Sequence, residues 1–228
     1  MSQENKNKTV DIPSVRATSD IPSVRATSDI VVVLDESGSM EKMGNEPVQA
    51  MNSFLREQKR MVTNDQGRDH VQLSLYLFST SVRKVIDNQS FTELKEFTDY
   101  NPSGMTALFD SIGKAINEKL ATPRNRNVTL LIVTDGEENS STEYKKKDVV
   151  ALTKRVKNEY GWNIQFLGAN IDAFKEGDGL GIDAQNCTNF SQKRGGFMKA
   201  MSAMSANTSA YRNSVYSQAH DLNFGNSN

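Results

Sequence analysis

The sequence predicts an α/β fold, in which a doubly wound, mostly parallel sheet carries helices on both faces and one antiparallel edge strand. Two short apolar runs, 30–34 and 128–134, are rich in β-branched residues and bounded by polar ones. Such runs are typical of parallel strands buried on both faces. Segments with apolar residues at helical spacing alternate with further strands along the chain, which indicates crossover helices.

The first half of the chain begins with the strand 30–34. Apolar residues at helical spacing, with Pro47 suited to a first turn, then predict a helix over 47–62. Alternating residues predict a strand over 71–77, and another strand near 82–86 follows too soon for a crossover helix. These two strands should therefore form an antiparallel hairpin at the sheet edge.

The second half continues the alternation of strands and helices. A loop at 100–106 leads into a helix whose apolar positions run from Leu108 to Leu120. The strand 128–134 follows. The remaining elements are expected to be a helix over about 146–158, a strand at 163–168, a short helical piece around 171–175 and a strand at 186–190.

A stripe of large apolar side chains near the C-terminus predicts a last helix. Phe197, Met198, Met201 and Met204 recur every three to four residues, and Tyr211 and Val215 extend the series. Such a stripe usually packs on the sheet. Because methionine adapts easily to different surfaces, an exposed partner-binding face is the alternative interpretation.

The chain divides into one domain with two tails. Residues 11–19 are repeated without a change at 20–28, and proline and small polar residues dominate both copies. We interpret 1–28 as a disordered N-terminal tail, 29–218 as the domain including its last helix, and 219–228 as a flexible tail. A docking role for the repeat is the alternative.

Composition narrows the function classes. The 228 residues carry a net charge of −1 and no basic stripe, which argues against binding nucleic acid through phosphate neutralisation. No apolar run approaches the roughly 18 residues of a membrane span, and residues 1–8 contain no apolar leader. We therefore expect a cytoplasmic monomer without a membrane partner. The single cysteine, Cys187, excludes an internal disulfide and is expected to be a small buried residue.

Polar residues follow both buried strands where each one ends. The loop 35–39 reads Asp-Glu-Ser-Gly-Ser, and Asp135 ends the run 128–134. If these strands lie side by side where the strand order reverses, their carboxyl ends meet in one crevice, and the loop containing Thr106 lies on the same edge. A threonine at the start of a helix is more often a plain N-cap than a ligand, and spacing alone does not separate the two roles of Thr106. The candidate metal ligands are Asp35, Ser37, Ser39, Thr106 and Asp135.

These five residues offer only oxygen donors, which suits a hard divalent cation such as Mg²⁺ or Mn²⁺. Two carboxylates balance the charge of the ion, and three hydroxyls add donors without adding charge. An ion held in this way can accept one further anionic ligand. No histidine or cysteine is at hand to favour Zn²⁺.

Three motifs together resemble the metal-ion-dependent adhesion site of von Willebrand factor A domains. They are Asp-x-Ser-x-Ser at 35–39, Gly-Met-Thr-Ala-Leu at 104–108 and Thr-Asp-Gly at 134–136, in matching order and context over roughly 29–190. The segments 166–173 and 137–139 are similar to stand-alone cytosolic A-domain proteins of bacteria and phages. The resemblance implies a Rossmann-like sheet, a divalent ion, usually Mg²⁺, held by the five residues, some through water, and a partner whose carboxylate completes the coordination.

Three further acidic residues lie near these motifs. Asp110 follows Thr106 by one helical turn, so it either orients Thr106 or a metal-bound water, or faces solvent. Glu137 and Glu138 are expected to form an acidic rim.

The function expected is a metal-dependent protein interaction module that is not an enzyme. A metal-dependent phosphotransferase or hydrolase is the alternative, but phosphotransferases of the haloacid dehalogenase type need a second carboxylate where Ser37 stands. The glycine spacing around Ser37 also differs from a hydrolase nucleophile elbow. A dinucleotide-binding loop would need more glycines after the first strand than Gly38 alone.

Overall fold

A computed structural model describes residues 26–224 apart from the short segments 65–68, 123–126 and 170–171. The described residues form a six-stranded sheet in the order β3-β2-β1-β4-β5-β6, parallel except for β3. This confirms the predicted doubly wound sheet with one antiparallel edge strand. The strands are β1 (Ala26–Asp35), β2 (Asp69–Phe78), β3 (Val82–Ser90), β4 (Asn127–Thr134), β5 (Asn163–Gly168) and β6 (Cys187–Asn189).

The order of the strands reverses between β1 and β4. The chain proceeds from β1 outward to β2 and β3, and then returns to the other side of β1 with β4, β5 and β6. Leu34 lies opposite Val133 in the register of β1 and β4, so the residues after these two strands emerge next to one another. Because ligands bind at such a reversal in open α/β sheets, this edge is where a site is expected.

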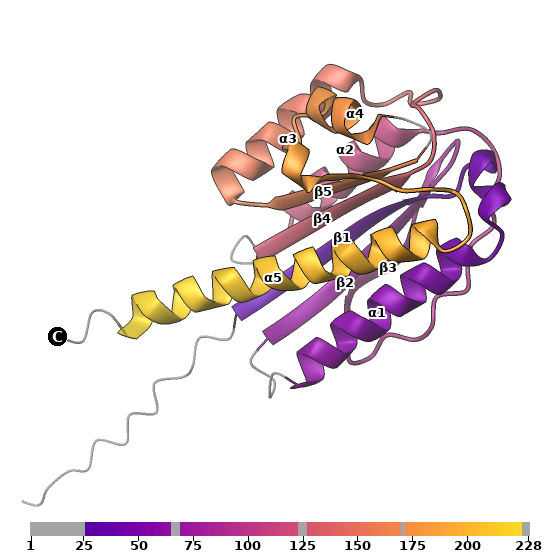
Figure 1. Ribbon diagram of the computed structural model, residues 1–228. Helices are drawn as coiled ribbons and strands as arrows, with labels where there is room; N and C mark the ends of the chain where they lie inside the picture. The colour runs from indigo at the N-terminus through magenta and orange to yellow at the C-terminus, as the bar shows by residue number, and fades with distance from the viewer. Residues whose placement is uncertain (1–25, 65–68, 123–126, 170–171, 225–228) are drawn as a thin grey trace, which may run out of the picture.

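Helices cover both faces of the sheet (Figure 1). Helices α1 (Glu46–Asn64) and α5 (Gly196–Phe224) lie side by side on one face, and α2 (Leu108–Leu120) and α3 (Lys146–Tyr160) lie on the other. A shorter helix, α4 (Ala173–Gly179), packs against β5 and β6. Successive residues of β1 alternate between the two cores, and none of those from Ile30 to Leu34 is more than 1% exposed. The strand is therefore buried on both faces, as its composition predicts.

The methionine stripe belongs to the core. Phe197, Met201 and Met204 are buried in the cluster that α1 and α5 form with the sheet, and Met198 packs against it. A buried amide adds a polar contact, since Gln58 of α1 donates hydrogen bonds to Ser205 on α5. The interpretation as an exposed partner-binding face is therefore wrong.

Two elements extend past the expected limits of the domain. Strand β1 begins at Ala26, three residues inside the predicted tail, and pairs there with the start of β2. Helix α5 continues to Phe224, through most of the segment 219–228 that was expected to be flexible. Residues 1–25, which contain most of the repeat, lie outside the described residues.

Smaller features complete the fold. A 3-10 helix that the sequence did not indicate spans Gly38–Met43. Cys187 is buried, as expected. Within the described residues, no helix combines the length and apolarity needed to cross a membrane.

Candidate metal centre

Asp35 ends β1 with its carboxylate completely buried. One oxygen, Oδ1, accepts a hydrogen bond from the backbone N–H of Ser37 at 2.7 Å, and Oδ2 accepts one from the Thr134 hydroxyl at 2.6 Å. Thr134 is the last residue of β4, so the neighbouring strand fixes the orientation of this carboxylate. Both oxygens therefore have a set direction before any cation arrives.

Hydroxyl groups connect Asp35 to Asp135. The Oγ atoms of Ser37 and Ser39 lie 3.0 Å apart, and Ser39 Oγ donates to Asp135 Oδ1 at 2.5 Å. The structure thus brings four of the five predicted residues into one hydrogen-bonded chain. Of the four side chains, only Ser39 is more than slightly exposed to solvent.

The space next to Gly136 places Thr106 beside the other candidate ligands. A Cβ at this glycine would lie 3.4 Å from Thr106 Oγ1 and 3.6 Å from Ser39 Oγ, so both hydroxyls converge on the space above it. Thr106 is buried, and its backbone N–H donates to Asn139 Oδ1 at 2.8 Å. The N-cap position of α2 is Ala107, and so the interpretation of Thr106 as a plain N-cap is wrong.

The loop containing Thr106 is fastened to the loop after β1. Gly38 donates its N–H to the carbonyl of Gly104 at 3.1 Å. Gly104 has a φ of +78°, and a Cβ there would lie 2.6 Å from Thr80 Oγ1, so both backbone conformation and space require glycine. This contact fixes Thr106 relative to Ser37 and Ser39.

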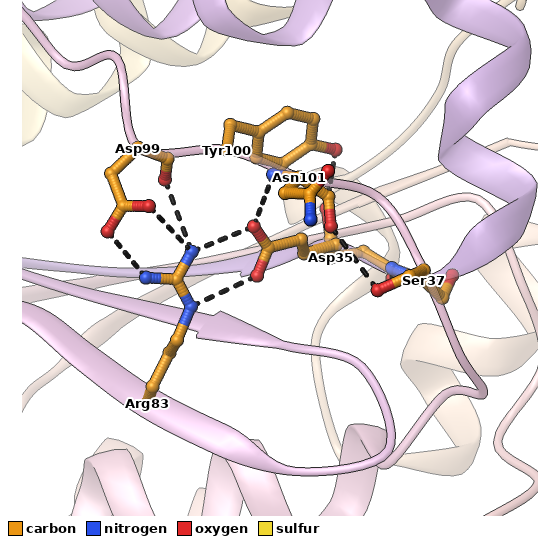
Figure 2. Close-up of polar contacts among 8 residues, drawn as sticks. Asp35, Ser37, Arg83, Asp99, Tyr100 and Asn101 are labelled. Carbon is orange, nitrogen blue, oxygen red and sulfur yellow. Dashed lines mark hydrogen bonds and ion pairs between the residues drawn. The ribbon is translucent and has the colours of Figure 1, made fainter.

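The buried Glu36, between the expected ligands, forms an ion pair with the half-exposed Arg83, which Figure 2 shows beside Asp99. Arg83 of β3 donates to both of its carboxylate oxygens, at 2.8 and 3.1 Å, and also contacts Asp99 at 2.6 Å. The Tyr100 hydroxyl donates to the backbone carbonyl of Asp35 at 2.7 Å. Strand β3 and the segment 99–101 therefore hold the loop after β1 from its outer side, a role that no local sequence signal predicts.

Gln192 is a further residue near the site that the sequence did not predict. It lies in the loop between β6 and α5, and its Nε2 donates to Asp135 Oδ2 at 2.6 Å. Asp135 thus has a partner on each oxygen, Ser39 on one and Gln192 on the other. Only the path of a loop 57 residues away brings this amide to the site.

The predictions for the neighbouring acids need two corrections. The Asp110 carboxylate neither orients Thr106 nor faces solvent; it accepts backbone N–H groups of Thr142, Glu143 and Tyr144 at 2.7–2.9 Å and so anchors the loop before α3. Glu138 accepts N–H groups from Phe109, at the start of α2, and from its own loop. Only Glu137 is exposed, as a rim residue would be.

Burial shifts the pKa values of both carboxylates in the same direction. Burial raises the pKa of Asp35 to about 6, although hydrogen bonds from Thr134 and Ser37 act in the opposite direction, and the charge of Asp135 raises it further. Burial also raises the pKa of Asp135, against the effects of Ser39, Lys42 and Gln192. Neither forms an ion pair with any residue the structure describes. The site therefore favours a cation between them.

The donor set fits a hard divalent ion. Two carboxylates and three hydroxyls converge, and all of these donors are oxygens. Across the described ranges, no group of three or more histidine, cysteine, aspartate or glutamate side chains is arranged to hold a metal. The chemistry of the centre thus depends on hydroxyls as much as on carboxylates.

With this geometry in view, comparison with known proteins identifies the family. Residues 29–215 match the family model described as the von Willebrand factor type A domain. The chain belongs to this family. No curated protein gives a significant match to it.

Solved structures of von Willebrand factor A proteins resemble the fold at low sequence identity. The mussel byssus proximal thread matrix protein 1 with a zinc-occupied MIDAS motif has a TM-score of 0.55 and 14% identity, covering 79% of this chain and 46% of its own. The pilus adhesin SpaC of Lactobacillus rhamnosus GG, in an open conformation, gives 0.61 and 14%, covering 80% and 30%. A Catenulispora acidiphila A domain gives 0.51 and 14%, covering 79% and 42%. This chain therefore spans less than half the length of each.

Proposed function

We propose that this A domain binds Mg²⁺ or Mn²⁺ through Asp35, Ser37, Ser39, Thr106 and Asp135, and through the ion binds an acidic side chain of a protein partner. The observation that carries the proposal is the pair of buried carboxylates, linked by serine hydroxyls and without a cationic partner in the described part of the chain. Burying a charge without compensation is unfavourable, so a divalent cation is the natural complement.

In the proposed site, the residues have different roles. Asp35 and Asp135 supply two negative charges, and the hydroxyls of Ser37, Ser39 and Thr106 supply neutral oxygens. Thr134 donates a hydrogen bond to Asp35 and Gln192 donates one to Asp135, which keeps the carboxylates oriented. The bound ion would supply a positive centre with room for one more anionic ligand. Because the protein adds only two charges, a carboxylate from outside is attracted rather than repelled.

Two of the similar structures support the proposal. The mussel protein holds zinc in its MIDAS motif, and the SpaC protein is a pilus adhesin. For this chain we favour Mg²⁺ or Mn²⁺ over Zn²⁺, because its donors are oxygens and no histidine or cysteine is among them.

Metal binding is tested by thermal unfolding of the metal-free protein with added Mg²⁺, Mn²⁺ or Zn²⁺. Ions that bind only the folded state raise the melting temperature by mass action. Asp135→Ala should remove the increase, whereas Asp87→Ala, which changes an exposed aspartate of β3, should keep it. An equal response in both variants would place the ion elsewhere.

Partner binding is tested by a pull-down with wild type and Asp35→Ala, in Mg²⁺ and in EDTA. Partners recovered only by wild type in Mg²⁺ support the metal bridge, and their acidic residues can then be neutralised one at a time. Recovery that survives EDTA and every neutralisation would rule the mechanism out.

The catalytic alternative is less well supported. Both oxygens of Asp35 accept hydrogen bonds, and Ser37 stands where an acidic partner would be needed. Hydrolysis of a generic aryl phosphate that depends on Asp35 would overturn this preference. The cytoplasmic location, the monomeric state and the absence of a nucleic-acid or membrane partner stay predictions.

A further inference from the structure

A polar hollow of about 320 Å³ lies beside the metal centre. One wall comes from the end of the 3-10 helix and the start of α1, and the other from the loop before α5. The side chains that can donate hydrogen bonds into it are Lys42, Asn45, Gln49, Gln192 and Arg194.

The hollow and the proposed metal site share residues. Gln192, which lines the hollow, donates a hydrogen bond to Asp135 Oδ2 at 2.6 Å. Lys42 is near enough to Asp135 for its charge to lower the pKa of that carboxyl. The hollow and the candidate metal site are therefore adjacent.

The charge of the hollow is positive. Lys42 and Arg194 are exposed and have no ion pair with any residue in the described ranges, and Lys193 adds a third exposed cation to the same loop. Glu46 is the one carboxylate in the lining, and it accepts backbone N–H groups of Gly195 and Met198 at 3.1 Å. Its charge is thus used at the start of α5 and not by the two cations.

We propose that this hollow binds a second acidic side chain of the same partner segment, a few residues from the carboxylate that completes the metal site. The inference rests on the proposed function and deepens it, since it makes the partner an acidic peptide with two carboxylates rather than one. A single carboxylate at a metal discriminates little among acidic surfaces. A second anion position at a fixed place selects for spacing, which gives the domain a specificity that the metal alone does not supply.

The test uses fluorescein-labelled Gly-Ser peptides with either one aspartate or two, the second placed one to four positions after the first. Fluorescence anisotropy in Mg²⁺ at low ionic strength gives the ratio of the two affinities for each protein. At one preferred spacing, wild type should bind the two-aspartate peptide about fivefold more tightly, the size expected for exposed charge pairs. The double variant Lys42→Gln/Arg194→Gln should lose this ratio.

The matched control is Lys154→Gln/Arg155→Gln, which removes the same charges from exposed positions on α3, on the opposite face of the sheet, and should keep the ratio. No spacing preference in wild type, or an equal preference in the Lys42→Gln/Arg194→Gln variant, overturns the proposal. Binding of the one-aspartate peptide that needs Mg²⁺ but shows no such preference would leave the metal bridge standing without the hollow. A preference that persists in EDTA and disappears in Lys42→Gln/Arg194→Gln would support the hollow and refute the metal bridge.

Discussion

Asp35→Asn should stabilise the metal-free protein while abolishing its response to Mg²⁺. An asparagine at this position can satisfy the hydrogen bonds that the carboxylate now makes. Its Oδ1 can accept from Ser37 N–H, and its Nδ2 can donate to Thr134 Oγ1, which then turns its own proton toward the carbonyl of Gly136, 3.1 Å away. The change therefore removes a buried charge and keeps both of these hydrogen-bonded contacts.

The magnitude follows from the pKa of Asp35. Raising it from 3.8 to about 6 corresponds to about 3 kcal/mol of folding free energy, lost once the group is ionised. Because the folded-state pKa is the higher one, the stabilisation by the neutral acid is fully present below pH 3.8 and is lost as the pH rises through 6. The variant should thus exceed wild type by about 3 kcal/mol at pH 7.5, and the difference should vanish toward pH 4.

The assay is urea unfolding in EDTA across this pH range, repeated in Mg²⁺. Adding Mg²⁺ should stabilise wild type and leave Asp35→Asn unchanged, so that the difference between them shrinks or reverses. Asp110→Asn is the control. Both oxygens of Asp110 accept backbone N–H groups, so the NH₂ group of an asparagine would face a donor and the change should lower the stability of the fold. A wild type more stable than Asp35→Asn in EDTA at pH 7.5 would refute the reasoning.

Three further predictions concern the surroundings of the site and the start of β1. Gly136→Ala places a methyl group 3.4 Å from Thr106 Oγ1. The variant should fold but show a smaller Mg²⁺-induced rise in melting temperature, and titration calorimetry can measure its weaker binding of Mg²⁺. Arg83→Ala leaves the buried Glu36 carboxylate without its cation and should cost about 2 kcal/mol in urea unfolding, whereas the same change at the exposed Arg56 should cost almost nothing. Deleting residues 1–25 should leave the melting temperature unchanged, whereas extending the deletion through Ser28 should lower it, because Ser28 is buried and pairs with β2 and β4; equal effects would contradict this.

The sheet could be predicted because strands that are buried on both faces consist mainly of apolar residues. The run 30–34 is apolar throughout, 128–134 contains only threonine besides apolar residues, and the short link before 82–86 permits only a hairpin. The composition of the sequence does not mark where each strand or helix begins and ends. Residues 26–28 are small and not strongly apolar, yet they extend β1 because β2 offers backbone partners to all three and β4 offers one to Ser28.

The candidate ligands were predictable because they lie in short motifs at strand and helix ends. The residues that support them were not, since their partners are distant in sequence. Arg83 meets Glu36 only because β3 folds back along β2, and Asp110 meets the loop 142–144 only through the path of the chain before α3. A carboxylate on a helix gives the same local pattern whether it faces solvent, a metal or a row of N–H groups.

The parts that surround the centre differ in how freely they can change. The loop after β1 is fixed by Arg83, Tyr100 and the contact between Gly38 and Gly104, so the positions of Ser37 and Ser39 follow from the rigid sheet. Arg194, by contrast, comes from the loop before α5 and, unlike Gln192 in the same loop, donates no hydrogen bond to a candidate ligand. Under the proposed function, substitution at Arg194 can therefore change which acidic partner is preferred while the positions of the candidate ligands stay the same.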